Sequence, residues 1–177
     1  ELPEPEVVAG TVLIRVMAAG LNPIDAIIAR GLLTNMLPHE YPLVLGRDAS
    51  GIVEAVGHDV SGIHVGDHVF GHVPLTAPIR LGTLADFAVL PADTVAKKPV
   101  LLDHLVAAAL PLSGAAAVSV VEAVGPVAGQ TILVNGASGG VGSFVVQMLV
   151  ARGGEVIGTG SASDVERLSA FLAEKCR

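Results

Sequence analysis

The sequence has 177 residues, of which 51% are hydrophobic, which is enough apolar material for one domain or two small ones. Its net charge is −7 and it holds only 10 Lys and Arg residues, so it does not resemble a basic nucleic-acid-binding protein. The single cysteine, Cys176, excludes an intrachain disulfide and a cysteine-rich zinc site.

The first half of the chain is built from short apolar runs separated by glycine and proline. After an extended lead-in over residues 1–10, a strand is expected at residues 11–17 and a turn with a helix start at residues 18–25. A loop into another strand is expected at residues 41–48, a further strand at 51–57, a turn plus a short strand at 65–70 and a last strand at 82–90. Short strands with frequent turn residues are typical of a compact β domain. We therefore predict an all-β barrel or similar domain over residues 1–103.

Residues 105–128 form the one membrane-like stretch. A spanning helix needs about 20 strongly apolar residues, and this stretch is interrupted by Pro111, Gly114 and Glu122. We interpret it as one or two buried helices. Because the start of the sequence also shows no signal-peptide pattern, we expect a soluble cytoplasmic protein with no membrane partner.

A strand, a glycine turn, a helix and a second strand follow in the remaining residues, 104–177. The strands are predicted at residues 131–134 and 155–158, and the helix at residues 143–152. One face of this helix carries apolar side chains at helical spacing: Val141, Phe144, Val145, Met148 and Leu149. This order is the beginning of an α/β, doubly wound nucleotide-binding domain.

The turn has three glycines at a spacing of three residues, Gly136, Gly139 and Gly142. Glycine lets backbone amides approach a phosphate, and a helix N-terminus adds partial positive charge. The candidate cofactor-binding residues are Gly136, Ala137, Ser138, Gly139, Gly140, Val141 and Gly142. The alternative is a tight turn that binds nothing, because a fold alone does not imply a function.

The segment after the second strand bears on cofactor choice. An NAD site commonly places a carboxylate about 20 residues after the glycine turn, and residues 158–161 contain none. Ser161 could hydrogen-bond a 2′-phosphate and Arg167 could pair with it, which favours NADP(H). The same segment can also be read as a loop followed by a capping box between Ser163 and Glu166.

Five segments carry a resemblance to a known superfamily. They are Val56–Gly57, Val65–Gly71, Gly82–Val89, Ala107–Pro111 and Asn135–Gly142. In order and spacing they resemble the medium-chain dehydrogenase/reductase superfamily over nearly the whole chain, and Asn22–Asp25 points to its zinc-independent quinone oxidoreductase branch. The resemblance implies a GroES-like β domain followed by a Rossmann domain that binds NADP(H). It also implies hydride transfer to a small-molecule quinone or activated enone.

The residues themselves argue against zinc. Asn22–Asp25 contains no cysteine, and the loop of the zinc-dependent branch, Gly-His-Glu, is replaced by Gly46-Arg47-Asp48. His64, His68 and His72 are four residues apart, but on a strand four residues span about 13 Å, too far for neighbouring histidines to share a zinc ion at about 2 Å. We therefore expect no metal site.

Asn22 is the candidate catalytic residue, placed beside the nicotinamide or the substrate carbonyl. Its amide can donate a hydrogen bond to a developing oxyanion. Alternatively it only caps the helix that follows Pro23. Tyr41 is a weaker candidate proton donor and is expected to pack next to Pro42. Asp25 and Asp48 are expected to be ionised at neutral pH unless strongly buried, so neither is an attractive acid.

Measured against the superfamily, the sequence looks truncated at both ends. Residues 131–177 leave room for only part of a Rossmann sheet, so this is either a fragment or a natural short form. Open strand edges recruit other chains, and we expect a homodimer or higher oligomer. The alternative function is a non-catalytic nucleotide-binding or interaction module.

Overall fold

The computed structural model describes residues 2–173 of the chain, so Cys176 lies outside the described residues. The chain divides into two compact units, residues 1–112 and residues 113–177. The sequence placed the boundary between residues 103 and 104. The helix α2 (His104–Ala108) accounts for the difference, because it packs against the β-sheet of the first unit.

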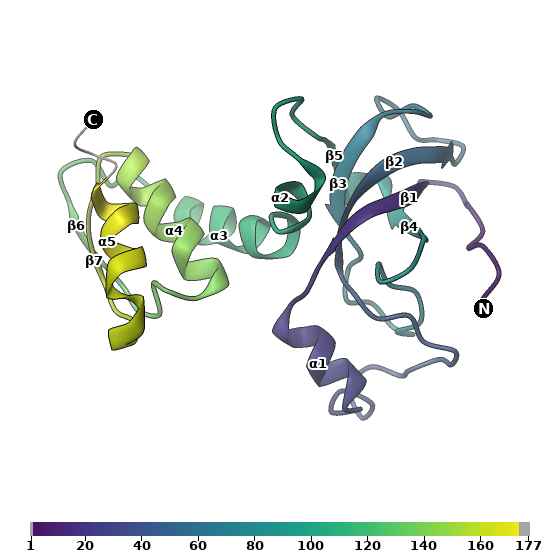
Figure 1. Ribbon diagram of the computed structural model, residues 1–177, viewed down its shortest axis with the longest axis horizontal. Coiled ribbons are helices and arrows are strands. Elements are labelled where there is room, and N and C mark those ends of the chain that lie inside the picture. The colour runs from purple at the N-terminus through teal and green to yellow at the C-terminus, as the bar shows by residue number, and fades with distance from the viewer. Residues whose placement is uncertain (1, 174–177) are drawn as a thin grey trace. The chain divides into compact units, whose positions relative to one another are not determined.

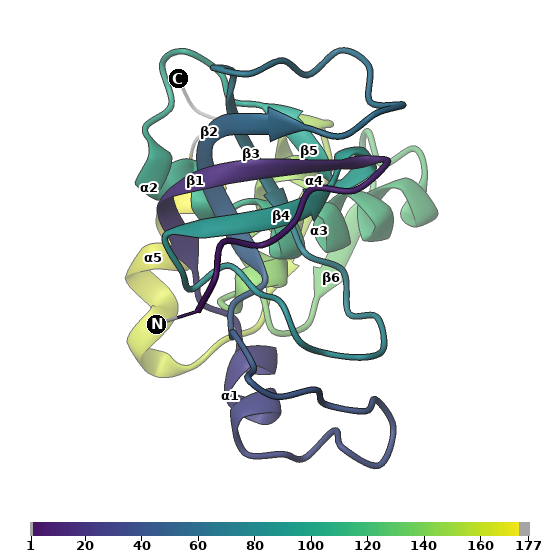
Figure 2. The ribbon, with the colours of Figure 1, turned by 90° about the vertical axis from the view of Figure 1, so that its right-hand side faces the viewer.

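An antiparallel sheet of five strands forms the first unit, in the order β4-β1-β2-β3-β5. The strands are β1 (Thr11–Gly20), β2 (Asp48–Val56), β3 (His68–His72), β4 (Phe87–Pro91) and β5 (Val95–Lys97). The two edge strands, β4 and β5, are consecutive in the chain and only the short helix η1 (Ala92–Thr94) separates them. The sheet must therefore curl round on itself, as a barrel does (Figure 2).

Alternating apolar residues fill the inside of this curled sheet. Val12 and Ile14 of β1 are fully buried, and Ala88 and Leu90 of β4 lie beside them in the pairing register. This alternation is the period of two that the sequence shows. The buried core of the first unit comprises Val12, Ile14, Ala49, Val53, Ile63, Val69, Ala88 and Leu90.

The helix α1 (Pro23–Ala29) follows β1 and lies apart from the sheet, at the bottom of Figure 1. It begins where expected, because Pro23 suits a first helical position and Asn22 is the N-cap residue. The backbone N–H of Asn22 donates to Asp25 Oδ2 at 2.8 Å. Tyr41, which we expected to pack next to Pro42, is instead 72% exposed, and its ring centroid lies 6.5 Å from that of His39 in an edge-to-face arrangement.

α2 is anchored to the sheet through His104. Its Nδ1 lies 2.8 Å from Ser50 Oγ, and Ser50 Oγ donates to the carbonyl of Val69. The His104 ring must therefore donate to Ser50, so its Nε2 accepts from His68 Nδ1 at 3.0 Å. Burial, followed by the charge of Lys98, lowers the pKa of His104.

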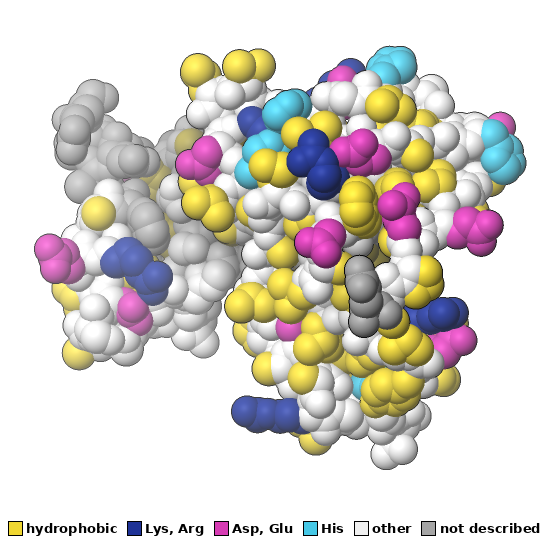
Figure 3. All heavy atoms as spheres, turned by 45° about the vertical axis from the view of Figure 1, so that its right-hand side comes forward, with side chains coloured by type: hydrophobic (Ala, Val, Ile, Leu, Met, Phe, Trp, Pro, Cys, Tyr) yellow, Lys and Arg dark blue, Asp and Glu magenta, His cyan; other side chains and the backbone are white. Residues whose placement is uncertain are grey.

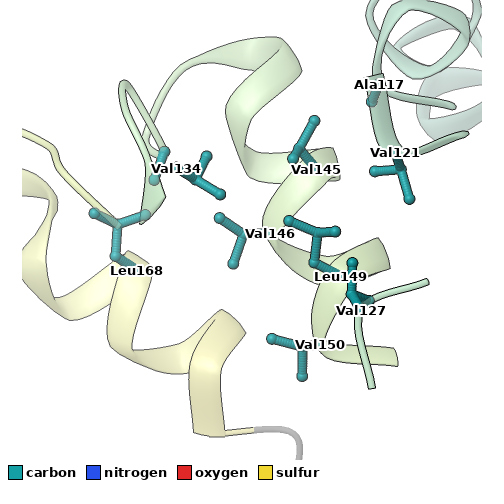
Figure 4. Close-up of a cluster of buried hydrophobic side chains, with 10 residues drawn as sticks. Ala117, Val121, Val127, Val134, Val145, Val146, Leu149, Val150 and Leu168 are labelled. Atoms are coloured by element: carbon teal, nitrogen blue, oxygen red, sulfur yellow. The ribbon is translucent and has the colours of Figure 1, made fainter. Parts of the chain in front are cut away.

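The second unit has a two-stranded parallel sheet covered on one face by a helix. Its elements are α3 (Pro111–Val124, which starts in the first unit), β6 (Thr131–Val134), α4 (Gly140–Ala151), β7 (Glu155–Gly158), η2 (Ala162–Asp164) and α5 (Val165–Ala173). α4 packs against both strands and against α5. Figure 4 shows the resulting apolar cluster, in which Val145, Val146, Leu149 and Val150 point from α4 toward the other elements.

Two sequence expectations about burial need correction. In the predicted apolar stripe, Val145 and Leu149 are buried, but Val141 is 37% exposed because it sits in the first turn of α4, before the helix meets the sheet. The stretch 105–128 was interpreted as one or two buried helices. In α3 the core cluster includes only Ala117 and Val121, four residues apart, because a helix packed on one side buries one stripe.

Among the described residues, no helix is long and apolar enough to cross a membrane. On the face drawn in Figure 3, Lys and Arg side chains stand singly rather than in a patch.

Candidate functional site

The glycine turn between β6 and α4 is held by Thr159, which directly follows β7. Gly136 adopts a left-handed backbone with φ of 73°. Its N–H donates to Thr159 Oγ1 at 3.0 Å, and the N–H of Ala137 donates to the Thr159 carbonyl at 2.8 Å. The turn is thus fixed to the carboxyl end of both strands, where open α/β sheets bind ligands.

Gly142 packs against the turn itself. A Cβ at this position would collide with the carbonyl oxygen of Gly136 and with Cα of Ala137. A side chain here would therefore push α4 away from the turn. This is the close helix–strand packing that the third glycine of a dinucleotide-binding turn provides.

The first turn of α4 presents backbone amides to solvent. Gly139 is the N-cap and provides no side-chain cap, and Gly139, Gly140 and Val141 are all exposed. The first N–H groups of a helix have no partner within it. Unpartnered amides and the positive end of the helix dipole fit a phosphate group. The residues at this turn therefore fit the pyrophosphate of a dinucleotide.

Ser161 and Arg167 are brought together, but around a carboxylate. Ser161 Oγ donates to Asp164 Oδ2 at 2.5 Å, and Arg167 Nη2 donates to Asp164 Oδ1 at 2.9 Å. Arg167 Nη2 also donates to the carbonyl of Ser138 in the glycine turn at 2.7 Å. Hydrogen bonds from Ser161, then from Ser138, lower the pKa of Asp164, so its carboxylate is ionised at neutral pH.

The expected capping box between Ser163 and Glu166 is not what closes this segment, since Ser163 Oγ instead bonds Ser161 Oγ at 2.8 Å. Asp164 is an acidic residue at this site that was not predicted from the sequence. It places one negative charge beside the proposed 2′-phosphate position and partly neutralises Arg167. The sequence could have revealed it, because Ser161, Asp164 and Arg167 are spaced by three residues across a helix start.

Asn22 lies in a second polar cluster, within the first unit. Its side-chain Nδ2 donates to Asp48 Oδ2 at 2.9 Å, and Asp48 Oδ1 accepts from the backbone N–H of Leu112 at 3.0 Å. The pairing of β1 with β2 sets Gly20 opposite Asp48 and so positions the two side chains. An amide nitrogen carries two hydrogens, so Asn22 can still donate one to a substrate oxygen.

Asp48 is only 2% exposed. Burial is the largest influence on it and raises its pKa, while the hydrogen bonds from Asn22 and Leu112 act in the opposite direction. From the sequence we expected Asp48 to be ionised unless it was strongly buried, and the structure buries it. Its carboxyl group fixes the orientation of the Asn22 amide.

The three histidines at a spacing of four do not share one site. His64 faces Asp67 at 3.7 Å, His68 contacts His104, and His72 ends β3. Within the described part of the chain, no group of three or more His, Cys, Asp or Glu side chains could hold a metal ion.

Comparison with known proteins identifies the family. The alcohol dehydrogenase GroES-like domain matches residues 8–100. The chain belongs to the medium-chain dehydrogenase/reductase superfamily. Its similarity to the quinone oxidoreductase-like branch, expected from Asn22–Asp25, is confirmed by the names of its relatives.

Two relatives illustrate the similarity. Mouse "NAD(P)H oxidoreductase RTN4IP1, mitochondrial" is 38% identical over 162 residues, which is 82% of this chain and 40% of the mouse protein. Pig quinone oxidoreductase is 36% identical over 158 residues, which is 89% of this chain and 46% of the pig protein. The chain thus spans less than half the length of these relatives.

Solved structures give the same fold. An alcohol dehydrogenase superfamily protein from Novosphingobium aromaticivorans matches with a TM-score of 0.87 and 37% identity, covering 96% of this chain and 51% of that one. A mycobacterial protein complexed with NADPH matches with a TM-score of 0.80 and 33% identity, covering 97% of this chain and 51% of that one. The predicted fold class, a GroES-like β domain followed by an α/β nucleotide-binding part, is confirmed.

Proposed function

We propose that this chain is the GroES-like domain and the first part of the Rossmann domain of a zinc-independent NADPH-dependent oxidoreductase, which transfers a hydride to a quinone or activated enone. The observation that carries the proposal is the glycine turn, whose exposed amides at the start of α4 fit a pyrophosphate. The reaction type in this proposal is taken from the quinone oxidoreductase-like branch of the superfamily. We keep the cytoplasm as the proposed compartment and a homodimer or higher oligomer as the proposed assembly.

The second unit would hold the cofactor. Residues 136–142 would bind the pyrophosphate through backbone amides, and Arg167, with Ser161, would pair with the 2′-phosphate. When bound, NADPH supplies the hydride. The chain's own part is to orient the cofactor, and Arg167 is already held at the turn by its hydrogen bond to Ser138.

Asn22 would act on the substrate. A carbonyl that accepts a hydride develops negative charge on oxygen, and a fixed amide donor stabilises that charge. Asn22 Nδ2 donates one of its hydrogens to Asp48 Oδ2, at a nitrogen–oxygen distance of 2.9 Å. Its other hydrogen would remain for the substrate oxygen. No metal is needed for this stabilisation, so we propose that none takes part.

One observation favours a second cofactor. Asp164 lies beside Ser161 and Arg167, and a carboxylate at such a place commonly accepts a hydrogen bond from the ribose hydroxyl of NAD. We favour NADPH because Arg167 pairs with Asp164 and balances its charge, and because Ser161 adds a donor. The alternative function is a non-catalytic nucleotide-binding or interaction module.

The test is an assay of the purified 177-residue chain with NADPH and a benzoquinone or an enone, following loss of reduced-nicotinamide absorbance. We expect turnover that a chelator leaves unchanged. Asn22→Ala should lower kcat by about a hundredfold, the usual effect of removing one oxyanion donor. Binding of NADPH without turnover of either acceptor would favour the non-catalytic module instead.

Two variants separate the donor role of Asn22 from its capping role. Asn22→Asp keeps a preferred N-cap residue but has no amide donor, so it should be as inactive as Asn22→Ala. Asn35→Ala removes an exposed asparagine of the first unit and should keep full activity. Thermal unfolding of each variant checks the fold. Full activity of Asn22→Asp would show that Asn22 is only a cap.

A further inference from the structure

The most unusual buried group in the first unit is Arg47, which directly precedes β2. Its side chain is only 3% exposed, whereas arginine is rarely buried without a charged partner. Nη1 donates to the carbonyl of Pro74 at 3.3 Å. Nε and Nη2 are buried and have no hydrogen-bond partner among the described residues. Each unmet buried donor of a charged group is costly to the fold.

No carboxylate of the described residues pairs with this guanidinium. The charge of Asp25 acts on Arg47, but Asp25 Oδ2 accepts from Asn22 N–H and Oδ1 accepts from Gly46 N–H at 3.2 Å. Burial is the larger influence and lowers the pKa of Arg47. The first unit therefore holds a cation whose burial its own residues offset only in part.

Arg47 lines a cavity of about 330 Å³. This is within the size range of small-molecule sites, which are mostly apolar with a few placed polar groups. Its walls are largely apolar and include Val73, Pro74, Ile79 and Leu81. Asn22, Asp48 and the glycine turn are not among the lining residues, so the cavity is separate from the groups assigned to the reductase.

The free edge of the guanidinium defines the chemistry of the ligand. Nε and Nη2 point the same way from one side of the planar group and match the two oxygens of a carboxylate. A ligand in the cavity that Arg47 lines would reach this edge only after the buried Nε and Nη2 turn toward it. Nε and Nη2, which now lack partners, would then each donate a charge-assisted hydrogen bond to the ligand.

The rest of the cavity favours a monoanion with an apolar tail over a phosphate. Glu40 also lines the cavity, where it pairs with Arg80 at 3.5 Å, and both side chains are half exposed. A dianionic phosphate would meet the Glu40 charge and would need more donors than one buried arginine offers. Apolar walls instead match a hydrocarbon chain.

We propose that this cavity is a second ligand site, which binds a small amphipathic carboxylate with its head group on Arg47 and its tail against the apolar walls.

The test is calorimetric titration of the 177-residue chain with hexanoate, with hexan-1-ol as a probe of equal tail and no charge. We expect saturable binding of hexanoate and at least about tenfold weaker binding of the alcohol, because the alcohol cannot form the charge-assisted pair. Arg47→Met should weaken hexanoate binding by at least about tenfold. Equal binding of the two probes, unchanged affinity in Arg47→Met, or no saturable binding of millimolar hexanoate would overturn the proposal.

Two further variants complete the design. Arg80→Met removes the half-exposed cation of the same cavity, and it should weaken binding by less than about fivefold, as exposed charges do. Leu81→Trp keeps Arg47 and enlarges a wall residue that is 43% exposed, so it should abolish binding by filling the space. If Arg47→Met does not fold, Leu81→Trp still decides the matter, because undiminished binding in it would contradict a site in this cavity.

Discussion

At the scale of single residues, the charge at the proposed cofactor site depends on Arg167 and on the Asp164 carboxylate that pairs with it. Arg167 holds Asp164 at 2.9 Å and the Ser138 carbonyl at 2.7 Å, so it is positioned before any ligand arrives. The Asp164 side chain is 25% exposed, and its hydrogen bonds lower its pKa and keep it ionised. A 2′-phosphate must therefore compete with Asp164 for Arg167, which predicts a measurable gain when that carboxylate is neutralised.

Asp164→Asn should increase the affinity for NADPH by about two- to fivefold, because removing one negative charge beside a phosphate near the protein surface changes binding by up to about 1 kcal/mol. The affinity for NADH should fall or stay the same. Fluorescence titration of both cofactors measures this. Glu166→Gln is the matched control, since it removes an exposed acid two residues away on α5. A loss of NADPH affinity in Asp164→Asn would mean that the carboxylate binds the ribose instead.

At the scale of elements, the sequence predicted the strands and helix starts that depend on local sequence pattern. The strands at residues 131–134 and 155–158 match β6 and β7, since apolar β-branched runs before and after a glycine turn are a local signal. β5 was missed because three residues carry too little pattern, and its place is set by pairing with β3. Asn22 at the start of α1 was foreseen from Asn-Pro, but its hydrogen bond to Asp48 joins residues 26 apart in sequence.

Burial of polar groups was the least predictable feature. Arg47 was read only as part of a loop that lacks a zinc ligand, and nothing local indicates that a charged residue will be 3% exposed. His104 was likewise overlooked, because its partner Ser50 is 54 residues away. Such contacts depend on how the sheet curls, which a single sequence does not show.

The exposed face of the β6–β7 sheet carries a prediction about association. Leu133 and Ile157 are register partners and are 66% and 56% exposed. Adjacent apolar side chains on a two-stranded sheet favour pairing with another chain. We expect light scattering at micromolar concentration to show a dimer or larger species, and the double variant Leu133→Thr, Ile157→Thr to shift it toward monomer.

The matched control for this face is Val100→Thr, Leu101→Thr. These residues are 94% and 101% exposed but lie in a loop rather than on a sheet, so their replacement should leave association unchanged. A monomeric unmodified chain, or dissociation by the control variant alone, would refute the role of the β6–β7 face.

At the scale of the whole molecule, the two units carry different parts of the proposed function. The first unit has the GroES-like sheet, the Asn22–Asp48 pair and the Arg47 cavity. The second has the glycine turn, Ser161 and Arg167. The proposed function needs both units. This chain spans less than half the length of the mouse and pig relatives, so cofactor binding by the second unit is the step on which the rest of the account depends.

Calorimetric titration of the 177-residue chain with NADPH and with NADH, at matched ionic strength, tests that step most directly. The account predicts saturable binding of both, with NADPH bound more tightly, and loss of the difference in Arg167→Ala. Loss of one arginine–phosphate pair corresponds to a decrease of about tenfold or more in NADPH affinity. Absence of binding, or tighter binding of NADH than of NADPH, would contradict the account.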